Sequence, residues 1–360
     1  MHGSLITVVD NGSTDGSIAE ITSKHPRVRF SPLGVNRGFT GGLAAALATS
    51  RARNIVFLNN DAIPERGWLA AISNAIENAP EDVVSVGGKI VSLDGKRIDF
   101  IGGMMTFDGH AFQNGFRMPL GAKAEPNAGD EILFACGGNM ISRRESLLAL
   151  GGFDDDYFAY LEDVDFGWRT WIAGKRATYE PRACVRHASS ATSNRLGDFE
   201  RGVLFERNAM QTAIKNFEDL RAHAGSVFFT YLHRLHHYAT TRNAQATELT
   251  REPFAGTVED RRPRLSGQAR RLSSTVLDDP LTTMQFRAFD WIMRNESRLA
   301  EKRAHVQAMR KRSDREIFER FPLHVVPTYP GDETLTSSAL FREMLGESTV
   351  ERKLDEIIQP

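Results

Sequence analysis

Cysteine is scarce in this sequence: only two of its 360 residues, Cys136 and Cys184, are cysteine. Two cysteines that stand in no CxxC pair cannot build a disulfide framework, so we expect free thiols in a reducing compartment. A net charge of either sign is also missing, since 45 Lys and Arg nearly balance 46 Asp and Glu. This balance argues against a nucleic-acid partner.

Long apolar runs are missing as well. No stretch reaches the roughly 18 to 20 apolar residues that span a bilayer. The opening residues, MHGSLITVVD, have neither the basic region nor the hydrophobic segment of a secretory signal. We therefore expect a cytoplasmic protein. The 41% of hydrophobic residues is enough for a substantial core, which excludes a disordered or collagen-like chain.

Glycine is abundant but unevenly distributed, with 24 of the 30 glycines in residues 1–200. The first part of the chain therefore needs many tight turns, whereas the part from about Phe199 onward is typical of helices. We predict an α/β domain over residues 1–215 and a helical C-terminal extension over residues 216–360. Within the extension, prolines and arginines predict a loop at 246–275.

Strand and helix patterns alternate through the first domain. They predict strands at 4–10, 28–32, 54–59 and 83–92, with helices between them at 17–23, 39–50 and 65–79. Such alternation predicts an α/β fold with a mostly parallel sheet flanked by helices. Ligands of such sheets bind beyond the carboxyl ends of the strands, so the residues that follow each strand are candidates for a site.

Polar, glycine-rich segments follow the first two predicted strands. In DNGSTDG, Asp10 would accept hydrogen bonds from a base or ribose; the alternative is that Asp15 or Ser13 only caps the next helix. In NRGFTGG, residues 36–42, free N–H groups at a helix start favour a diphosphate. The alternative is that its glycines only allow close helix packing. The chain has no GxGxxG after these strands and no GxxxxGK[ST], which disfavours a Rossmann dinucleotide site and a P-loop.

Asn59, Asn60 and Asp61 follow the third predicted strand. Carboxylate and amide oxygens suit Mg²⁺ or Mn²⁺, and such ions usually take one or two protein carboxylates together with substrate phosphates. The alternative is a plain turn with Pro64 at the start of the next helix. A later predicted strand ends in His187. A lone histidine is more often structural, and His187 becomes a candidate metal ligand only if the fold brings it beside Asp61.

A predicted helix at residues 161–173 begins with a group of acidic residues. On a helical wheel its apolar residues form one face, with Glu162, Asp165 and Arg169 beside it, and the last two are spaced for an ion pair. Asp163 points almost opposite the core in the first turn, where the helix dipole keeps a carboxylate ionised. This placement suits a general base. Glu162 and Asp165 are better explained by the preference of acids for helix starts.

Together these segments resemble the inverting glycosyltransferases of family 2, which have the GT-A fold. The resemblance covers about residues 4–215, and it rests on VVDNGSTDGS, NRGFTGG, FLNNDAIP, GGNMISRRESLLALGGFDDDYFAYLEDVDFGWR and the downstream His187. The pattern looks like the subgroup of rhamnosyltransferases and their galactofuranosyl-transferring relatives. It implies transfer of a sugar from a UDP- or dTDP-sugar to a hydroxyl of a growing glycan or a polyprenyl-linked acceptor. It also implies a role in bacterial cell-wall or polysaccharide biosynthesis at the inner face of the membrane.

The resemblance implies a role for each matching residue. Asp163 would be the general base that deprotonates the acceptor, and Asp61 and His187 would hold the divalent cation, Mg²⁺ or Mn²⁺. Asp10 would contact the nucleoside base. The other residues implied at the donor are Asn11, Ser13, Asp15, Asn36, Gly38, Phe39, Gly41, Gly42 and Asn60. Those implied on the acceptor side are Gly137, Gly138, Asn139 and Glu162.

The sequence departs from the family pattern in two places. The metal motif reads Asn-Asn-Asp at residues 59–61, with an amide where a carboxylate is expected, and only MHG precedes Ser4, where family members have a first strand and helix. A second hypothesis is therefore a truncated fragment or a catalytically inactive relative that acts as a binding or scaffold module. A third, a sugar-phosphate nucleotidyltransferase, would need a basic glycine-rich loop after the first strand, whereas DNGSTDG is acidic.

Two features of the extension have two interpretations each. Residues 298–320 are rich in Arg and Lys, which predicts either a solvated helix face or a surface for anionic lipid or a polyprenyl-diphosphate acceptor, with peripheral membrane contact. His233, His236 and His237 fall on one helix near Tyr231, where packing is expected ahead of metal binding.

Overall fold

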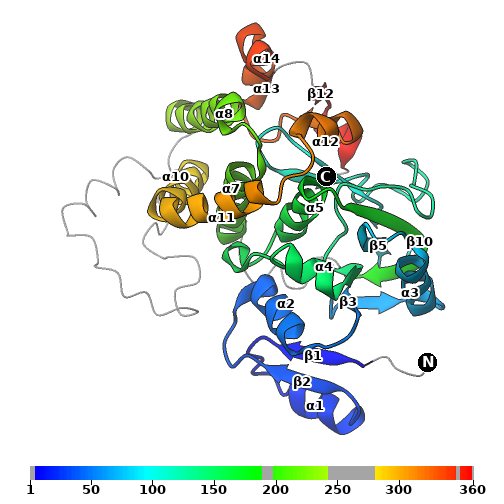
Figure 1. The fold of residues 1–360 in the computed structure, drawn as a ribbon. Helices are drawn as coiled ribbons and strands as arrows, with labels where there is room; N and C mark the ends of the chain where they lie inside the picture. Colours follow the sequence, from blue (N-terminus) through cyan, green and yellow to red (C-terminus); the bar gives the residue numbers. More distant parts are fainter. Residues whose placement is uncertain (1–4, 189–197, 242–279, 346–348, 359–360) are drawn as a thin grey trace, which may run out of the picture.

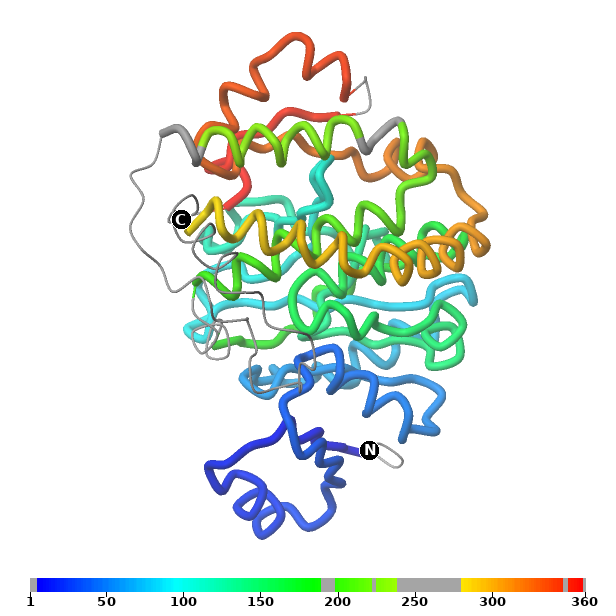
Figure 2. The backbone as a smooth tube through the Cα atoms, turned by 90° about the vertical axis from the view of Figure 1, so that its left-hand side faces the viewer, coloured from blue at the N-terminus to red at the C-terminus, as the bar shows by residue number. Residues whose placement is uncertain are grey.

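The protein is described here by a computed structural model, which covers residues 5–188, 198–241, 280–345 and 349–358. A central sheet separates a small N-terminal unit from a set of C-terminal helices (Figure 1). The view turned by 90° again places these two parts at opposite ends of the molecule (Figure 2). The predicted α/β class with flanking helices is confirmed.

The N-terminal unit follows the predicted alternation closely. It consists of β1 (Thr7–Asp10), α1 (Ser17–Lys24), β2 (Arg29–Pro32) and α2 (Gly38–Thr49). The two strands are parallel, with Val8 opposite Phe30. In the described part of the chain they form a sheet of their own, with no hydrogen-bonded ladder to the central sheet.

The central sheet has six strands. They are β3 (Asn54–Leu58), β4 (Ala62–Pro64), β5 (Val83–Ser92), β6 (Ile98–Phe100), β9 (Asn139–Arg143) and β10 (Arg176–His187). Their order is β3-β9-β5-β10-β4, with β6 paired to β5. Within this sheet, among the described residues, only β5 and β10 are parallel neighbours, so the expectation of a mostly parallel sheet is wrong. The short connection between β5 and β6 cannot make the long crossover that a parallel pair needs.

Helices pack against this sheet through separate groups of buried side chains. From α3 (Trp68–Asn78), Ile72 and Ile76 are fully buried against β5, β9 and β10. From α5 (Glu162–Ile172), Trp168 and Trp171 enter another core cluster together with residues of the C-terminal region. The remaining elements of this part are β7 (Gly103–Met105), β8 (Ala111–Gln113), α4 (Arg144–Ala149) and the 3-10 helix η1 (Asp155–Tyr157).

The C-terminal region is mainly helical but also contains two short strands. Its elements are α7 (Asp198–Asn216), α8 (Leu220–Thr241), α10 (Pro280–Arg294), α11 (Glu296–Ala308), α12 (Asp314–Arg320), β11 (Leu323–Val325), α13 (Asp332–Thr336), α14 (Ala339–Leu345), β12 (Thr349–Glu351) and α15 (Leu354–Ile357). The helical pattern that begins at residue 281 is interrupted at Asn295, which separates α10 from α11. The predicted loop at 246–275 lies outside the described residues. Every helix in the described ranges is too short or too polar to cross a lipid bilayer.

Candidate active site

The ends of β1 and β2 form one hydrogen-bonded unit. Asn11 Nδ2 donates to Asn36 Oδ1 at 3.0 Å, and the Arg37 N–H donates to Asn11 Oδ1 at 2.8 Å. Asp10, at the end of β1, is 7% exposed and accepts the Ser13 N–H at 3.0 Å. The two segments predicted to contact a donor are therefore brought together.

The start of α2 touches the segment before α5. Gly38 has φ 74°, and a Cβ there would lie 2.3 Å from the Phe158 carbonyl oxygen, so only glycine fits. The same oxygen accepts the Thr40 N–H at 3.2 Å. A Cβ on Gly137 would lie 3.1 Å from the Phe39 ring. The donor-side candidate Phe39 thus lies against the acceptor-side candidate Gly137, and we call this contact the seam. Close packing against Phe158 explains the glycine at position 38.

The other donor-side candidates differ in their surroundings. The Asp15 carboxylate accepts the N–H of Ser17, the first residue of α1, at 3.1 Å, as in the capping interpretation. Gly41 lies against Arg37, and Gly42 faces Val9 of β1. Asn60 is exposed in the turn between β3 and β4. A donor role for these residues stays a prediction.

His187 and Asp61 lie side by side because β10 and β4 pair in register, with His187 opposite Ala62. The His187 Nε2 atom is 3.0 Å from Asp61 Oδ1 and 3.2 Å from Asn59 Nδ2. Both side chains are mostly buried, at 16% exposed for His187 and 19% for Asp61. The condition that the sequence sets for a metal role of His187 is therefore met.

The donor set at this pair suits a divalent cation. Two neighbouring ligands of an octahedral cation at about 2.1 Å lie about 3.0 Å apart, which matches the spacing of Asp61 Oδ1 and His187 Nε2. In the part of the chain that the structure describes, no cluster of three His, Cys, Asp or Glu side chains could hold a metal. A cation at Asp61 and His187 would therefore need further ligands from a substrate, as phosphates supply.

Asp99, in β6, was not found by sequence reasoning. Its Oδ2 lies 2.8 Å from His187 Nδ1. Burial by itself lowers the pKa of His187, but the hydrogen bonds and charges of Asp99 and Asp61 outweigh it and raise the pKa. The signal in the sequence is a lone carboxylate between two apolar residues, Ile98 and Phe100, in a strand too short to show a pattern.

Asp163 is the one residue of α5 that is not fully buried. Its Oδ2 accepts the Gly137 N–H at 3.2 Å and its Oδ1 accepts the Val164 N–H at 2.9 Å. Burial raises its pKa despite these donors. The carboxylate is thus held in place at the seam where Phe39 also lies, and its raised pKa favours proton uptake.

Glu162 sits next to Asp163 and is 6% exposed. Burial, and then the negative charge of Asp163, raise the pKa of Glu162 to about 8. Its Oε2 has no hydrogen-bond partner. The turn that leads into these two acids is strained, because Phe158, Tyr160 and Leu161 all have positive φ values. The preference of acids for helix starts explains neither the buried oxygen without a partner nor the strained turn, so Glu162 remains a candidate site residue.

Asn139 does not have the environment expected of a residue at an acceptor cleft. It is fully buried, and its Nδ2 donates to the carbonyls of Lys89 and Ala183 at 3.0 and 2.9 Å. Its Oδ1 accepts the Trp68 Nε1–H at 2.8 Å. All of its amide groups are therefore used to join α3, β5 and β10, and we correct its acceptor-side assignment to a structural one.

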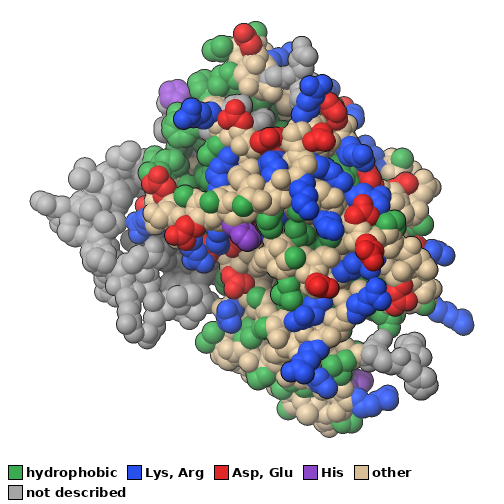
Figure 3. Space-filling view, in the orientation of Figure 1, with side chains coloured by type: hydrophobic (Ala, Val, Ile, Leu, Met, Phe, Trp, Pro, Cys, Tyr) green, Lys and Arg blue, Asp and Glu red, His purple; other side chains and the backbone are tan. Residues whose placement is uncertain are grey.

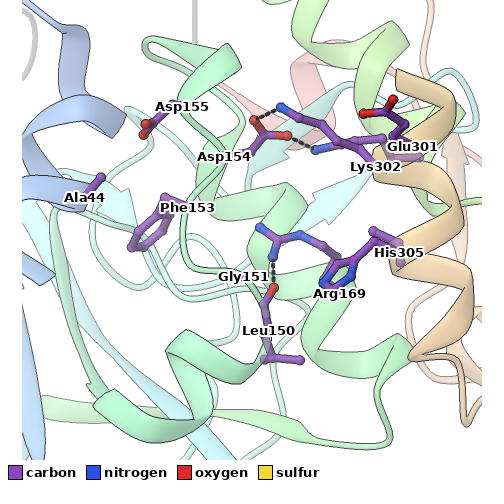
Figure 4. Close-up of a pocket in the computed structure, with 12 residues that line it drawn as sticks. Ala44, Leu150, Gly151, Phe153, Asp154, Asp155, Arg169, Glu301, Lys302 and His305 are labelled. Atoms are coloured by element: carbon purple, nitrogen blue, oxygen red, sulfur yellow. Dashed lines mark hydrogen bonds and ion pairs between the residues drawn. The ribbon is translucent and has the colours of Figure 1, made fainter. Parts of the chain in front are cut away.

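Asp165 and Arg169 form the predicted ion pair, at 2.8 Å between Arg169 Nη2 and Asp165 Oδ2. Arg169 lines a cavity of about 510 Å³ between α2, α5, α7 and α11 (Figure 4). In this cavity Asp154 is bound by Lys302 and by Lys215, and Arg169 reaches the Leu150 carbonyl. No residue of the predicted site lines the cavity, and its buried charges are paired with one another.

The basic residues of 298–320 are largely engaged with the rest of the protein. Arg298 and Lys302 pair with Asp156, and Arg320 pairs with Glu131 at 2.5 Å. On the face that Figure 3 shows, basic and acidic side chains are intermixed. The His233 side chain lies 3.0 Å from the Gly331 carbonyl oxygen, as expected for packing between α8 and the segment before α13. The ion pairs of Arg298, Lys302 and Arg320 therefore join the extension to the domain, whereas the contact of His233 lies within the extension.

Comparisons with known proteins point to the same family that the sequence motifs resemble. The model of the family described as Glycosyl transferase family 2 matches residues 5–151. The chain is 26% identical over 214 residues to the N-acetylglucosaminyl-diphospho-decaprenol L-rhamnosyltransferase of Mycobacterium tuberculosis, covering 53% of this chain and 68% of that enzyme. It is 25% identical over 190 residues to the pre-mycofactocin glycosyltransferase of the same organism, covering 52% of this chain and 38% of the relative.

Solved structures show only distant similarity. GalNAc-T7 with UDP, GalNAc and Mn²⁺ has a TM-score of 0.47 at 12% identity, covering 66% of this chain and 45% of that chain. The mannosyltransferase PcManGT from Pyrobaculum calidifontis, with GDP-Man and Mn²⁺, has a TM-score of 0.40 at 19% identity, covering 81% and 77%. Similarities this distant carry no argument about ligands. Residues 5–151 therefore match glycosyltransferase family 2, and the curated relatives that the chain resembles are glycosyltransferases.

Proposed function

We propose that this chain is an inverting, metal-dependent glycosyltransferase that moves rhamnose or a galactofuranose-like sugar from a UDP- or dTDP-sugar to a hydroxyl group. The observation that carries the proposal is that a pair suited to a cation and a carboxylate held at Gly137 are joined through Asn59, whose N–H donates to the Gly138 carbonyl at 3.0 Å and whose Nδ2 lies 3.2 Å from His187 Nε2. His187 lies 3.0 Å from Asp61, while Asp163 and Phe39 meet at Gly137. A carboxylate base and a cation-binding pair on one domain are the two parts that transfer from a nucleotide sugar requires.

In the proposed reaction Asp163 accepts the proton of the acceptor hydroxyl. The acceptor oxygen then forms a bond to the anomeric carbon, while the bond from that carbon to the diphosphate oxygen breaks and its electron pair leaves with the diphosphate. Attack from the face opposite the leaving group inverts the configuration. The backbone N–H groups of Gly137 and Val164 hold the Asp163 carboxylate in position for this step. Glu162, with a pKa raised to about 8, stays protonated at neutral pH and can hydrogen-bond to a sugar hydroxyl.

The pair of Asp61 and His187 would hold Mg²⁺ or Mn²⁺, with Asn59 next to it. A bound cation would supply positive charge that stabilises the leaving diphosphate. Asn11 and Asn36, locked together at the ends of β1 and β2, would bind the nucleotide part of the donor. The acceptor is proposed to be a glycan or a lipid-linked sugar, because the Mycobacterium tuberculosis relative is named for a diphospho-decaprenol acceptor.

Nucleotide binding tests the donor site. Titration calorimetry with UDP, dTDP and GDP, each with and without Mn²⁺, should show binding that depends on the cation and prefers UDP or dTDP. Asp61→Ala should weaken it at least tenfold. Asp94→Ala, which removes an exposed carboxylate in the turn between β5 and β6, is the matched control and should leave it unchanged. Nucleotide binding that needs neither cation nor Asp61 would contradict the proposal.

A second candidate, a nucleotide-binding module without turnover, is favoured by one observation. The sheet of β1 and β2, which carries Asp10 and Asn11, has no ladder to the central sheet in the described residues. The two candidates differ in turnover. Release of UDP or dTDP from the nucleotide sugar, abolished in Asp163→Asn, supports the transferase, whereas cation-dependent binding without any release by the unmodified chain supports the binding module.

A further inference from the structure

A buried carboxylate that belongs to none of the predicted motifs lies behind His187. Asp99 is 5% exposed, and its Oδ2 is 2.8 Å from His187 Nδ1. On the opposite edge of the ring, Nε2 is 3.0 Å from Asp61 Oδ1. The imidazole therefore has a different carboxylate at each of its nitrogens. Of the two nitrogens, only Nε2 faces Asp61, the other residue to which the proposed function assigns the cation.

We propose that Asp99 is a positioning residue that fixes the His187 ring with Nε2 toward Asp61 and so strengthens divalent-cation binding by these two residues. The inference rests on the proposed function for the identity of the cation site. It adds a residue that touches neither cation nor substrate and acts through the orientation of His187.

The three strands at this end of the sheet explain why the contact forms. His187 pairs with Ser92 of β5, and Ile98 of β6 pairs with Val91 of the same strand. β10 and β6 are therefore both hydrogen-bonded to the last residues of β5, and Asp99 follows directly on Ile98. Because β6 is buried at all three positions, the Asp99 carboxylate is held by its surroundings against the ring.

The chemistry of imidazole explains what the contact does. A neutral imidazole has one N–H donor and one nitrogen with a lone pair, and the partner of one nitrogen decides which is which. A carboxylate accepts hydrogen bonds, and the contact of Asp99 with Nδ1, at 2.8 Å, is shorter than that of Asp61 with Nε2, at 3.0 Å, so we assign the hydrogen to Nδ1. Nε2 is then left with the lone pair that a cation needs. Carboxylates that orient a ligating histidine in this way typically change metal affinity by about 10–100-fold.

Cation affinity of the full chain tests the proposal. In titrations of Mn²⁺ in the presence of UDP, Asp99→Ala should weaken Mn²⁺ binding by about 10–100-fold. Asp99→Asn keeps the shape and an oxygen that can accept the Nδ1 hydrogen, so its loss should be smaller, a few-fold. Asp94→Asn is the control and should match the unmodified chain. Asp61→Ala and His187→Ala are measured in parallel to test the site itself.

Nitrogen-15 NMR of the histidine side chains gives a readout without cation or activity. In metal-free protein, at a pH where the ring is neutral, His187 should carry its hydrogen on Nδ1. In Asp99→Ala the hydrogen should shift to Nε2, where Asp61 accepts it. Circular dichroism and melting curves establish that each variant is folded, and if Asp99→Ala does not fold, Asp99→Asn carries the test through its few-fold loss.

The outcomes separate this inference from the proposed function. Mn²⁺ affinity within twofold of the unmodified chain in Asp99→Ala, or an unchanged His187 hydrogen position, would overturn the inference while His187→Ala still loses binding. An Asp99→Asn affinity equal to that of the unmodified chain would do the same if the alanine variant is unfolded. Full Mn²⁺ affinity in both Asp61→Ala and His187→Ala, or none in the unmodified chain, would overturn the cation site and this inference with it.

Discussion

Two histidines of this protein are each placed between two carboxylates, and they have opposite surroundings. His187 lies at strand ends, between Asp61 and Asp99. His110 lies in the turn between β7 and β8, with Nδ1 3.1 Å from Asp108 and Nε2 3.1 Å from Glu206. The first is partly accessible, whereas the second is fully enclosed.

The difference lies in the cations that accompany the acids. Around His110, the buried Arg234 binds Asp332 at 2.8 Å and Asp108 at 3.3 Å, so the acids have a second cationic partner inside the core. Among the described residues Asp61 has no Lys or Arg ion pair, which leaves room for a cation from solution. A histidine between two carboxylates therefore has two different roles in this protein. Around His110, together with Arg234 and Asp332, it joins the β7–β8 turn to α7, α8 and α13. Around His187 it is a candidate metal site.

The largest effect is expected at the open site. Asp163→Asn should lower kcat for sugar transfer by roughly 10²–10⁴-fold, because the amide cannot accept the acceptor proton. Nucleotide binding with Mn²⁺ should be unchanged, since Asp163 is not part of the cation pair. Steady-state kinetics and calorimetry measure the two quantities, and full turnover in this variant would show that another group is the base.

Replacing each histidine by alanine separates the two sites. His110→Ala should lower the free energy of unfolding by about 3–5 kcal/mol, because it removes the side chain that pairs closely with both Asp108 and Glu206 and leaves these buried acids with the more distant Arg234. His187→Ala should instead weaken Mn²⁺ binding about 10–100-fold with a much smaller loss of stability. Urea unfolding and Mn²⁺ titration of both variants check this. Equal losses of stability in both would remove the distinction between clamp and site.

Sequence reasoning located the long elements well and the short ones poorly. β5 was predicted with its observed ends because ten residues of apolar pattern lie between clear turns. β4 and β6 have three residues each, too few for any periodicity, and they decide where Asp61 and Asp99 lie. Their absence from the prediction, together with that of β9, which is antiparallel to both β3 and β5, is why a mostly parallel sheet was expected.

The candidate site shows the same limit. Asn11, Asn36 and Asp61 could be found because they follow recognisable strands. The acceptor-side role of Asn139 was implied by the family resemblance alone, which does not show that its amide joins elements far apart in the sequence. Asp99 could not be found, since its partner His187 is 88 residues away and only pairing of both strands with β5 brings them together.

The pH dependence of stability should report on the enclosed histidine. Burial opposes protonation of His110, but the charges of Asp108 and Glu206 outweigh it and raise its pKa to about 10. The folded state therefore binds the proton more tightly than the unfolded state, whose histidine pKa is about 6.5. The resulting stabilisation is complete below pH 6.5 and is lost as the pH rises toward 10.

His110→Gln should flatten that decline. The groups that contact His110 are Asp108, Glu206 and the ring of Tyr329, at 6.3 Å between ring centroids, and Arg234 lies next to both acids. Melting temperatures of both chains between pH 6 and pH 9.5 measure the effect. An equal decline in both would assign the pH dependence to other groups.

The smallest effects on stability are expected for ion pairs near the surface of the protein. Lys302→Met should lower the free energy of unfolding by about 1–2 kcal/mol, because Asp154 and Asp156 are nearly buried and keep only their other partners. Arg315→Met removes an exposed pair with Glu319 and should leave the melting temperature unchanged. This contrast bears on the lipid hypothesis for residues 298–320. If Arg315→Glu abolishes flotation with anionic liposomes while the protein stays folded, the exposed end of this segment binds lipid. If flotation is unchanged, the basic residues of this segment have the same structural role as Lys302.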